Sequence, residues 1–171
     1  VNFFDVAELY PVPATAETYA ETERIIGNWF EKSGNRDKVV LATKIAGPGD
    51  YTAHIRTNGF SKEALNDAVD KSLKRLTTAY IDLYQMHWPE RDTNTFGVRD
   101  YSHSSKDPWT DNFNEVLHNL DEIVKSGKIR KVGISNEKAW GTMRYLEEST
   151  KNELPRMITI QNAYNLLNRV F

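Results

Sequence analysis

Short apolar runs alternate along the chain with longer stretches in which apolar residues recur at helical spacing. The apolar runs predict buried β-strands over residues 1–5, 39–42, 81–88, 131–135 and 157–161. The stretches between them predict amphipathic helices over residues 15–33, 61–76, 113–126 and 138–150. Strands and helices that alternate in this way pack as a parallel sheet covered by helices, so the predicted fold class is α/β.

Two arrangements of such units fit the pattern: a closed barrel of eight β/α units and an open, doubly wound sheet. No Gly-x-Gly-x-x-Gly motif follows a predicted strand, which counts against a dinucleotide-binding open sheet. The third strand stops at Pro89, because proline cannot donate to a sheet ladder, and this places His87 and Trp88 at its carboxyl end. In parallel α/β folds, ligands bind at that end of the strands.

Local signals mark several element boundaries. Ser61 is placed to cap the second helix, while Gly34 and Gly127 are placed to end the first and the third. Residues 89–111 show no helical or strand period, and a loop of that length is usually functional or disordered. We expect this loop to cover a pocket because it contains the aromatic residues Phe96, Tyr101 and Trp109.

Composition narrows the function classes. We expect residues 1–171 to form a single domain, because this length supports one sizeable core. The 22 basic and 24 acidic residues leave a net charge of −2 with no basic stripe, which argues against binding to nucleic acid or to anionic membranes. The absence of cysteine excludes disulfides and thiolate metal sites and suits a reducing cytoplasm. No apolar run is long enough to cross a bilayer, and no histidine spacing indicates a metal site.

Polar and aromatic residues stand at or just after the carboxyl ends of all five predicted strands. These residues are Asp5 with Tyr10, Lys44, His87 with Trp88, Ser135 with Asn136, and Gln161 with Asn162. Because these strand ends share one rim in a parallel barrel, we expect the side chains to converge there.

The residue types at this rim favour carbonyl reduction. A tyrosine keeps its proton at neutral pH, and a nearby ammonium lowers the pKa of the phenol, so Lys44 would make Tyr10 a better acid. Asp5 would orient Lys44, and His87 would hydrogen-bond to a substrate oxygen. Such an acid completes the reduction of a carbonyl group when a nicotinamide supplies the hydride.

Each residue also has an ordinary structural interpretation. Tyr10 alone is explained as a pocket-lining or surface aromatic, Lys44 as a solvated lysine, and His87 as a histidine near the core. Asp5 is also explained as a loop cap, and Ser135-Asn136 as the cap of the next helix. The functional interpretation rests on all of them falling at the same end of successive strands.

Four segments of the chain resemble motifs of the aldo-keto reductase family, in the family's order. They are Phe3 to Tyr10, Leu41 to Lys44, Asp82 to Pro89, and Gly127 to Asn136. The segments at 144–146 and 160–169 further resemble the Tas-like branch, close to the potassium-channel β-subunit-like reductases.

The resemblance implies a (β/α)8 TIM barrel and NADPH-dependent reduction of aldehydes or ketones. By motif, Tyr10 would be the general acid, and Lys44 would tune its pKa. Asp5 would pair with Lys44, and His87 would orient the substrate carbonyl.

The same resemblance implies a cofactor and substrate site. Ser135, Asn136 and Gln161 would hold the nicotinamide carboxamide, and Trp88 would form a wall of the substrate pocket. Glu137 departs from the aromatic residue that commonly follows the family's Ser-Asn pair, which weakens any inference about the substrate.

The chain opens inside a predicted strand without a starting methionine, and we expect it to be a fragment that carries about strands 2 to 6 of the 8 in the barrel. The loops that bind the cofactor phosphates, and the residues that choose NADPH over NADH, would then lie outside it. Two alternatives stay open: a non-catalytic, redox-sensing barrel subunit, or an inert fragment. Exposed sheet edges in such a fragment also favour self-association.

Overall fold

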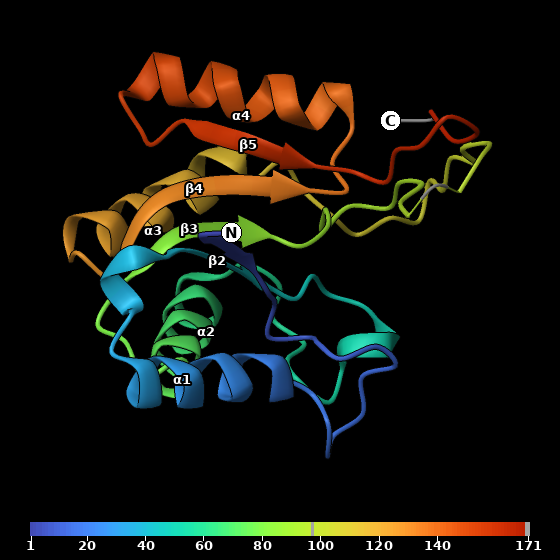
Figure 1. Cartoon of the computed structure of the whole chain (residues 1–171). Coiled ribbons are helices and arrows are strands. Elements are labelled where there is room, and N and C mark those ends of the chain that lie inside the picture. Colours follow the sequence, from blue (N-terminus) through green and yellow to red (C-terminus); the bar gives the residue numbers. More distant parts are fainter. Residues whose placement is uncertain (97, 170–171) are drawn as a thin grey trace.

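The computed structural model describes residues 1–96 and 98–169, which form a curved parallel sheet flanked by helices (Figure 1). The five strands are β1 (Phe3–Asp5), β2 (Val40–Ile45), β3 (Ile81–Met86), β4 (Ile129–Ser135) and β5 (Met157–Gln161). The α-helices are α1 (Glu21–Ser33), α2 (Lys62–Arg75), α3 (Phe113–Lys125) and α4 (Ala139–Asn152). Two short 3₁₀-helices, at Arg36–Lys38 and Asp50–Thr52, lie in the connections.

The strands lie in the sheet in the same order as in the sequence, β1-β2-β3-β4-β5, and every pair is parallel. An α-helix occurs in each connection between neighbouring strands, so the described residues form consecutive β/α units. This arrangement is half of a (β/α)8 barrel and confirms the predicted fold class. The long connections and the C-terminal segment extend from the carboxyl ends of the strands, on one side of the molecule (Figure 1).

Several predicted boundaries were wrong by a few residues. The first helix begins at Glu21 and not at residue 15, because residues 15–20 form turns in which Thr15 and Thr18 bond to each other. Strand β2 continues past residue 42 to Ile45, because its pairing with β3 extends to Met86. The extension of β2 depends on a neighbouring strand, which a local pattern does not contain.

The predicted helix signals were correct. The Ser61 hydroxyl accepts a hydrogen bond from the backbone N–H of Ala64 and so satisfies a free donor in the first turn of α2. Gly34 follows α1 in the left-handed conformation, with a φ of 63°, which a residue without a Cβ adopts at low cost. Gly127, two residues after α3, also has a positive φ of 82°.

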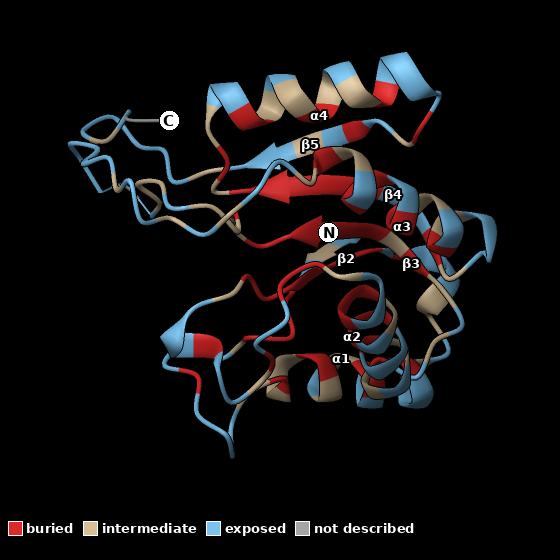
Figure 2. Ribbon diagram, turned by 180° about the vertical axis from the view of Figure 1, so that it is seen from behind, coloured by how far each residue is buried: buried red, intermediate tan, exposed pale blue. Residues whose placement is uncertain are grey.

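The hydrophobic core lies between the central strands and the helices (Figure 2). Strands β2, β3 and β4 are largely buried, as expected of parallel strands with a neighbour on each side. Strand β5 is at the edge of the sheet, and its Ile158 and Ile160 are exposed. The edge strand β5 is therefore less buried than the central strands.

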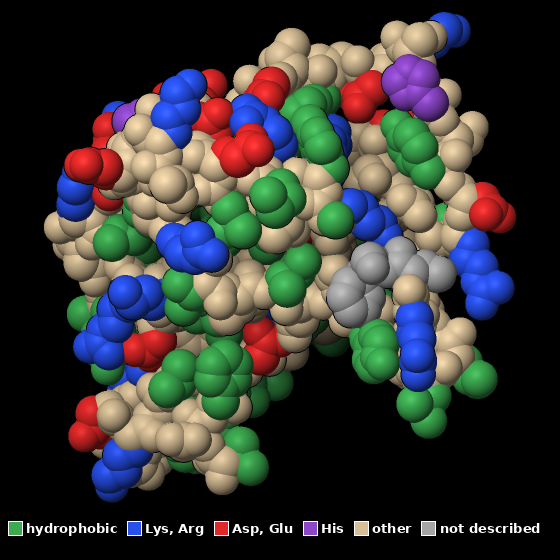
Figure 3. Space-filling view, turned by 90° about the horizontal axis from the view of Figure 1, so that it is seen from above, with side chains coloured by type: hydrophobic (Ala, Val, Ile, Leu, Met, Phe, Trp, Pro, Cys, Tyr) green, Lys and Arg blue, Asp and Glu red, His purple; other side chains and the backbone are tan. Residues whose placement is uncertain are grey.

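The surface shows no separation of charge on the face drawn in Figure 3, where basic and acidic side chains are interspersed. In the part of the chain that the structure describes, none of the helices has the length and apolar character required to cross a membrane.

Candidate active site

Four side chains, from three neighbouring strands and the loops that follow them, meet at the carboxyl end of the sheet. Asp5 ends β1, Lys44 lies in β2, and His87 directly follows β3. The fully buried Lys44 donates hydrogen bonds from Nζ to Asp5 Oδ2 at 2.8 Å and to the carbonyl of Val6 at 2.9 Å. The Tyr10 hydroxyl lies 3.4 Å from His87 Nε2, and Lys44 Nζ lies 5.1 Å from the centre of the Tyr10 ring.

Pairing of β1 with β2 brings these residues together. Asp5 lies opposite Ala42 in the parallel register, two residues before Lys44. Beyond the strand, the backbone N–H of Glu8 donates to the carbonyl of Lys44, and the chain then turns so that the Tyr10 N–H donates to Ala7. The tyrosine therefore faces the strand end that carries the lysine.

Burial dominates the electrostatics of the site. It lowers the pKa of His87 to about 3, with a further lowering from the positive charge of Lys44, so the imidazole is neutral at physiological pH. Burial also lowers the pKa of Lys44, while the hydrogen bond to Asp5 opposes this.

The pKa of Tyr10 differs from the sequence-based expectation. We expected Lys44 to lower it, but burial raises the pKa of the Tyr10 phenol, and the negative charge of Asp5 raises it further. The Lys44 ammonium donates to Asp5 and Val6, so its charge is largely offset by the carboxylate beside it.

The residues predicted to hold the nicotinamide adjoin this group. The Ser135 hydroxyl donates to the carbonyl of Gln161 at 2.8 Å, and Gln161 Nε2 donates to Asp5 Oδ2 at 3.0 Å. Asn136 Nδ2 donates to the carbonyl of His87 at 2.9 Å. A hydroxyl and two amides can donate and accept hydrogen bonds, so this set of groups fits a carboxamide.

A pocket of about 620 Å³ opens beside Tyr10 and His87. Its other lining residues are mostly apolar or aromatic: Leu9, Val12, Pro48, Gly49, Asp50, Tyr51, Trp88 and Phe96. The size and lining suit a small organic ligand beside Tyr10.

Trp88 lines this pocket. Its Nε1 donates to the carbonyl of Pro48 at 3.0 Å, and its ring stacks edge-on against Phe96 with the ring centres 5.6 Å apart. The long loop therefore contributes Phe96 to the pocket. Of its other aromatics, Trp109 lines an adjacent hollow and Tyr101 is exposed beside His103.

Glu137, which departs from the family's aromatic residue, is buried in an ion pair. Both oxygens of its carboxylate accept hydrogen bonds from Arg91, which comes from the long loop after β3. A Cβ at Gly141 would lie 2.4 Å from the Glu137 carboxyl carbon, so the helix offers space for the carboxylate only because residue 141 is glycine.

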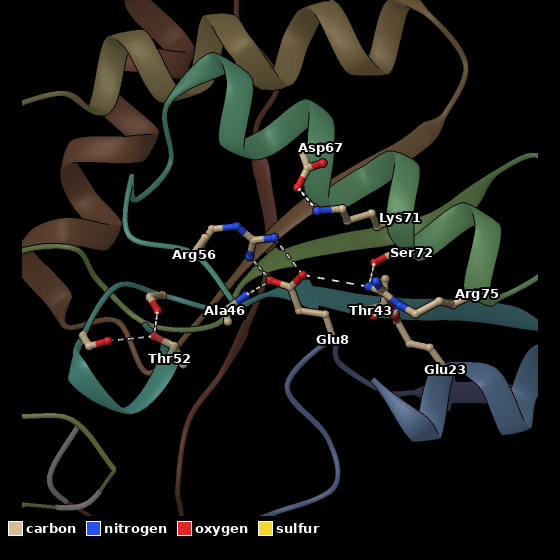
Figure 4. A network of polar contacts seen from close by, with 12 residues as sticks. Glu8, Glu23, Thr43, Ala46, Thr52, Arg56, Asp67, Lys71, Ser72 and Arg75 are labelled. Carbon is tan, nitrogen blue, oxygen red and sulfur yellow. Dashed lines mark hydrogen bonds and ion pairs between the residues drawn. The ribbon is translucent and has the colours of Figure 1, made fainter. Parts of the chain in front are cut away.

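Sequence reasoning also missed a buried cluster of charged residues, which Figure 4 shows. It comprises Glu8, Glu23, Arg56 and Arg75. The one signal in the sequence was Glu8 itself, an acidic residue set between apolar neighbours two positions before Tyr10. Among the described residues, His, Asp and Glu side chains form no group that could hold a metal ion.

Comparison with known proteins decides the family. The model of the Aldo/keto reductase family matches residues 1–171, the whole chain. The chain belongs to the aldo-keto reductase family. The resemblance found in its strand-end motifs is therefore confirmed.

Several relatives of this aldo-keto reductase chain cover nearly all of it. It is 47% identical to Protein tas of Escherichia coli, over 100% of the chain and 50% of that protein. It is 34% identical to the uncharacterized oxidoreductase YrpG of Bacillus subtilis, over 99% of the chain and 46% of that protein. Norsolorinic acid reductase B of Aspergillus parasiticus is 29% identical, over 98% of the chain and 38% of that protein. The chain thus spans half or less of the length of these relatives.

Proposed function

We propose that the protein containing this chain is an NADPH-dependent oxidoreductase that reduces aldehyde or ketone carbonyls to alcohols. The observation that carries the proposal is the meeting of Tyr10, His87 and the Lys44–Asp5 pair at the mouth of an apolar pocket. Membership of the aldo-keto reductase family, whose chemistry is carbonyl oxidoreduction with nicotinamide cofactors, supports it.

In this proposal the substrate oxygen lies between Tyr10 and His87. The neutral imidazole of His87 donates a hydrogen bond to the carbonyl oxygen, and Tyr10 transfers its proton to that oxygen as negative charge develops there. Lys44 stabilises the phenolate that results, which then recovers a proton from solvent. Asp5 holds Lys44 in place throughout.

Ser135, Asn136 and Gln161 would hold the carboxamide of the nicotinamide in reach of the substrate. When bound, the reduced cofactor supplies the hydride that reaches the carbonyl carbon. The choice of NADPH follows from the family resemblance. A cytoplasmic location is proposed because a chain without cysteine suits a reducing compartment.

The test is Tyr10→Phe in the full-length protein. Loss of the acid should lower kcat for aldehyde reduction about 10²- to 10⁴-fold, because proton transfer contributes that much. NADPH affinity, followed by the quenching of tryptophan fluorescence, should stay at the wild-type value. Tyr101→Phe, in the exposed part of the long loop, is the matched control and should keep wild-type kcat.

Two results would contradict the proposal. Wild-type turnover by Tyr10→Phe would show that another group donates the proton. No consumption of NADPH across a panel of aldehydes and ketones would favour a non-catalytic, redox-sensing subunit.

A further inference from the structure

The buried charge cluster of Figure 4 includes Glu8, which stands two residues before Tyr10. Glu8, which is 1% exposed, pairs through both carboxylate oxygens with Arg56. The distance from Arg56 Nη2 to Glu8 Oε2 is 2.9 Å. Glu8 Oε1 also accepts the backbone N–H of Ala46 at 2.6 Å.

Glu8 connects the segments that carry two of the proposed catalytic residues. It stands two residues before Tyr10, and Ala46 stands two residues after Lys44. The backbone of Val6 and then of Glu8 donates to the carbonyls of Ala42 and Lys44, which continues the pairing beyond β1. Two residues beyond Lys44, the N–H of Ala46 donates to the Glu8 carboxylate. In a continuing sheet a backbone carbonyl of the neighbouring strand would accept this bond.

We propose that Glu8, held by Arg56, is a positioning residue for the reduction. It fixes the turn that carries Tyr10 against the strand end that carries Lys44, and so sets the place of the phenol relative to Lys44 and His87. This inference rests on the proposed function. It adds residues that touch neither the substrate nor the reacting atoms.

Arg56 allows the Glu8 carboxylate to be buried next to the turn that carries Tyr10. The Arg56 side chain is only 6% exposed, and it comes from the connection between β2 and α2. A buried carboxylate without a partner takes up a proton or moves toward water, because burial penalises an unpaired charge. With Arg56 in place, both oxygens of the Glu8 carboxylate have a guanidinium partner.

Glu23 offers a matched control inside the same cluster. It is fully buried and accepts hydrogen bonds from Thr43 Oγ1 and Arg75 Nε, each at 2.6 Å. Among the described residues, no hydrogen bond or ion pair joins its carboxylate to the turn that carries Tyr10 or to Ala46. Substitution of Glu23 should therefore disturb the cluster and the stability of the protein without releasing Tyr10.

The experiment compares Glu8→Ala, Glu8→Gln and Glu23→Gln in the full-length protein. Kinetics with NADPH and an aldehyde give kcat and KM, and fluorescence gives the dissociation constant of NADPH. Amide hydrogen exchange reports the protection of the Ala46 and Tyr10 N–H groups, which are both hydrogen-bonded in this structure.

We expect Glu8→Ala to lower kcat about 100-fold, because a displacement of about 1 Å at a reacting group has that effect. NADPH affinity should stay unchanged, and exchange at Ala46 and Tyr10 should become faster. Glu8→Gln keeps an acceptor for Ala46 but opposes Arg56 with an amide donor, so its loss of kcat should be smaller. Glu23→Gln should keep wild-type kcat and wild-type exchange at both amides.

Three outcomes would overturn the inference: wild-type kcat in folded Glu8→Ala, an equal loss of kcat in Glu23→Gln, or unchanged exchange in the Glu8 variants. If Glu8→Ala does not fold, Glu8→Gln decides, since wild-type kcat and exchange there would also overturn it. A wild-type protein that reduces no carbonyl would instead refute the proposed function. The exchange of Ala46 and Tyr10 would still decide whether Glu8 holds the turn.

Discussion

A single residue, His87, should make the stability of the protein depend on pH, because its buried imidazole is neutral. Its pKa is about 3 in the folded protein and 6.5 ordinarily, so the unfolded chain takes up the proton first as the pH falls. The free energy of unfolding should decrease as the pH falls from about 6.5 toward 3, by at most about 1.4 kcal/mol per pH unit. Urea denaturation of wild type and His87→Gln at a series of pH values measures it, and equal slopes would contradict it.

The position of the Trp88 side chain requires a glycine at residue 47, because a Cβ there would overlap the indole ring. A Cβ there would lie 2.2 Å from the indole Nε1. Gly47→Ala should displace Trp88, destabilise the protein by about 1–3 kcal/mol and raise KM for the carbonyl substrate. In a Trp88→Phe background the same change should cost less, because the smaller ring leaves space. Equal costs in both backgrounds, measured by urea denaturation, would show that the contact is unimportant.

The pair Arg91–Glu137 joins two elements, the loop after β3 and the start of α4. Glu137 is 3% exposed, and the Arg91 guanidinium lies 5.0 Å from the centre of the Trp140 ring. Removing one partner leaves a buried charge unpaired, so Arg91→Met or Glu137→Gln should each destabilise the protein by about 3 kcal/mol. The double variant should recover much of this loss in a denaturation experiment. Additive losses would mean that the two residues act independently.

The element scale is also where prediction from the sequence worked best. Helix and strand types follow from apolar spacing, which is local, and the Ser61 cap and the Gly34 terminator are chemistry of single residues. The boundaries that failed had two causes: a local turn at residues 15–20 delays the start of α1, and a neighbouring strand sets the end of β2. β2 reaches Ile45 because β3 lies beside it.

At the scale of the whole molecule, the chain presents apolar side chains at both edges of its sheet. Phe3 in β1 and Ile158 and Ile160 in β5 are about half exposed, and an open strand edge pairs readily with another chain. The 171-residue polypeptide alone should self-associate as its concentration rises. Sedimentation velocity measures this, and Ile160→Lys should reduce it. A monomer at every concentration, with or without the lysine, would be the contrary result.

The sequence by itself determined the α/β order, the parallel sheet and the strand ends at which Asp5, Lys44 and His87 stand. Periodicity and strand termination are properties of neighbouring residues, so no coordinates were needed. Only the tertiary structure decided which buried charges meet. Arg56 pairs with Glu8 across 48 positions and Arg91 with Glu137 across 46, and no local pattern links such partners. It also decided that the pKa of Tyr10 rises, because burial and the pairing of Lys44 with Asp5 depend on the packed chain.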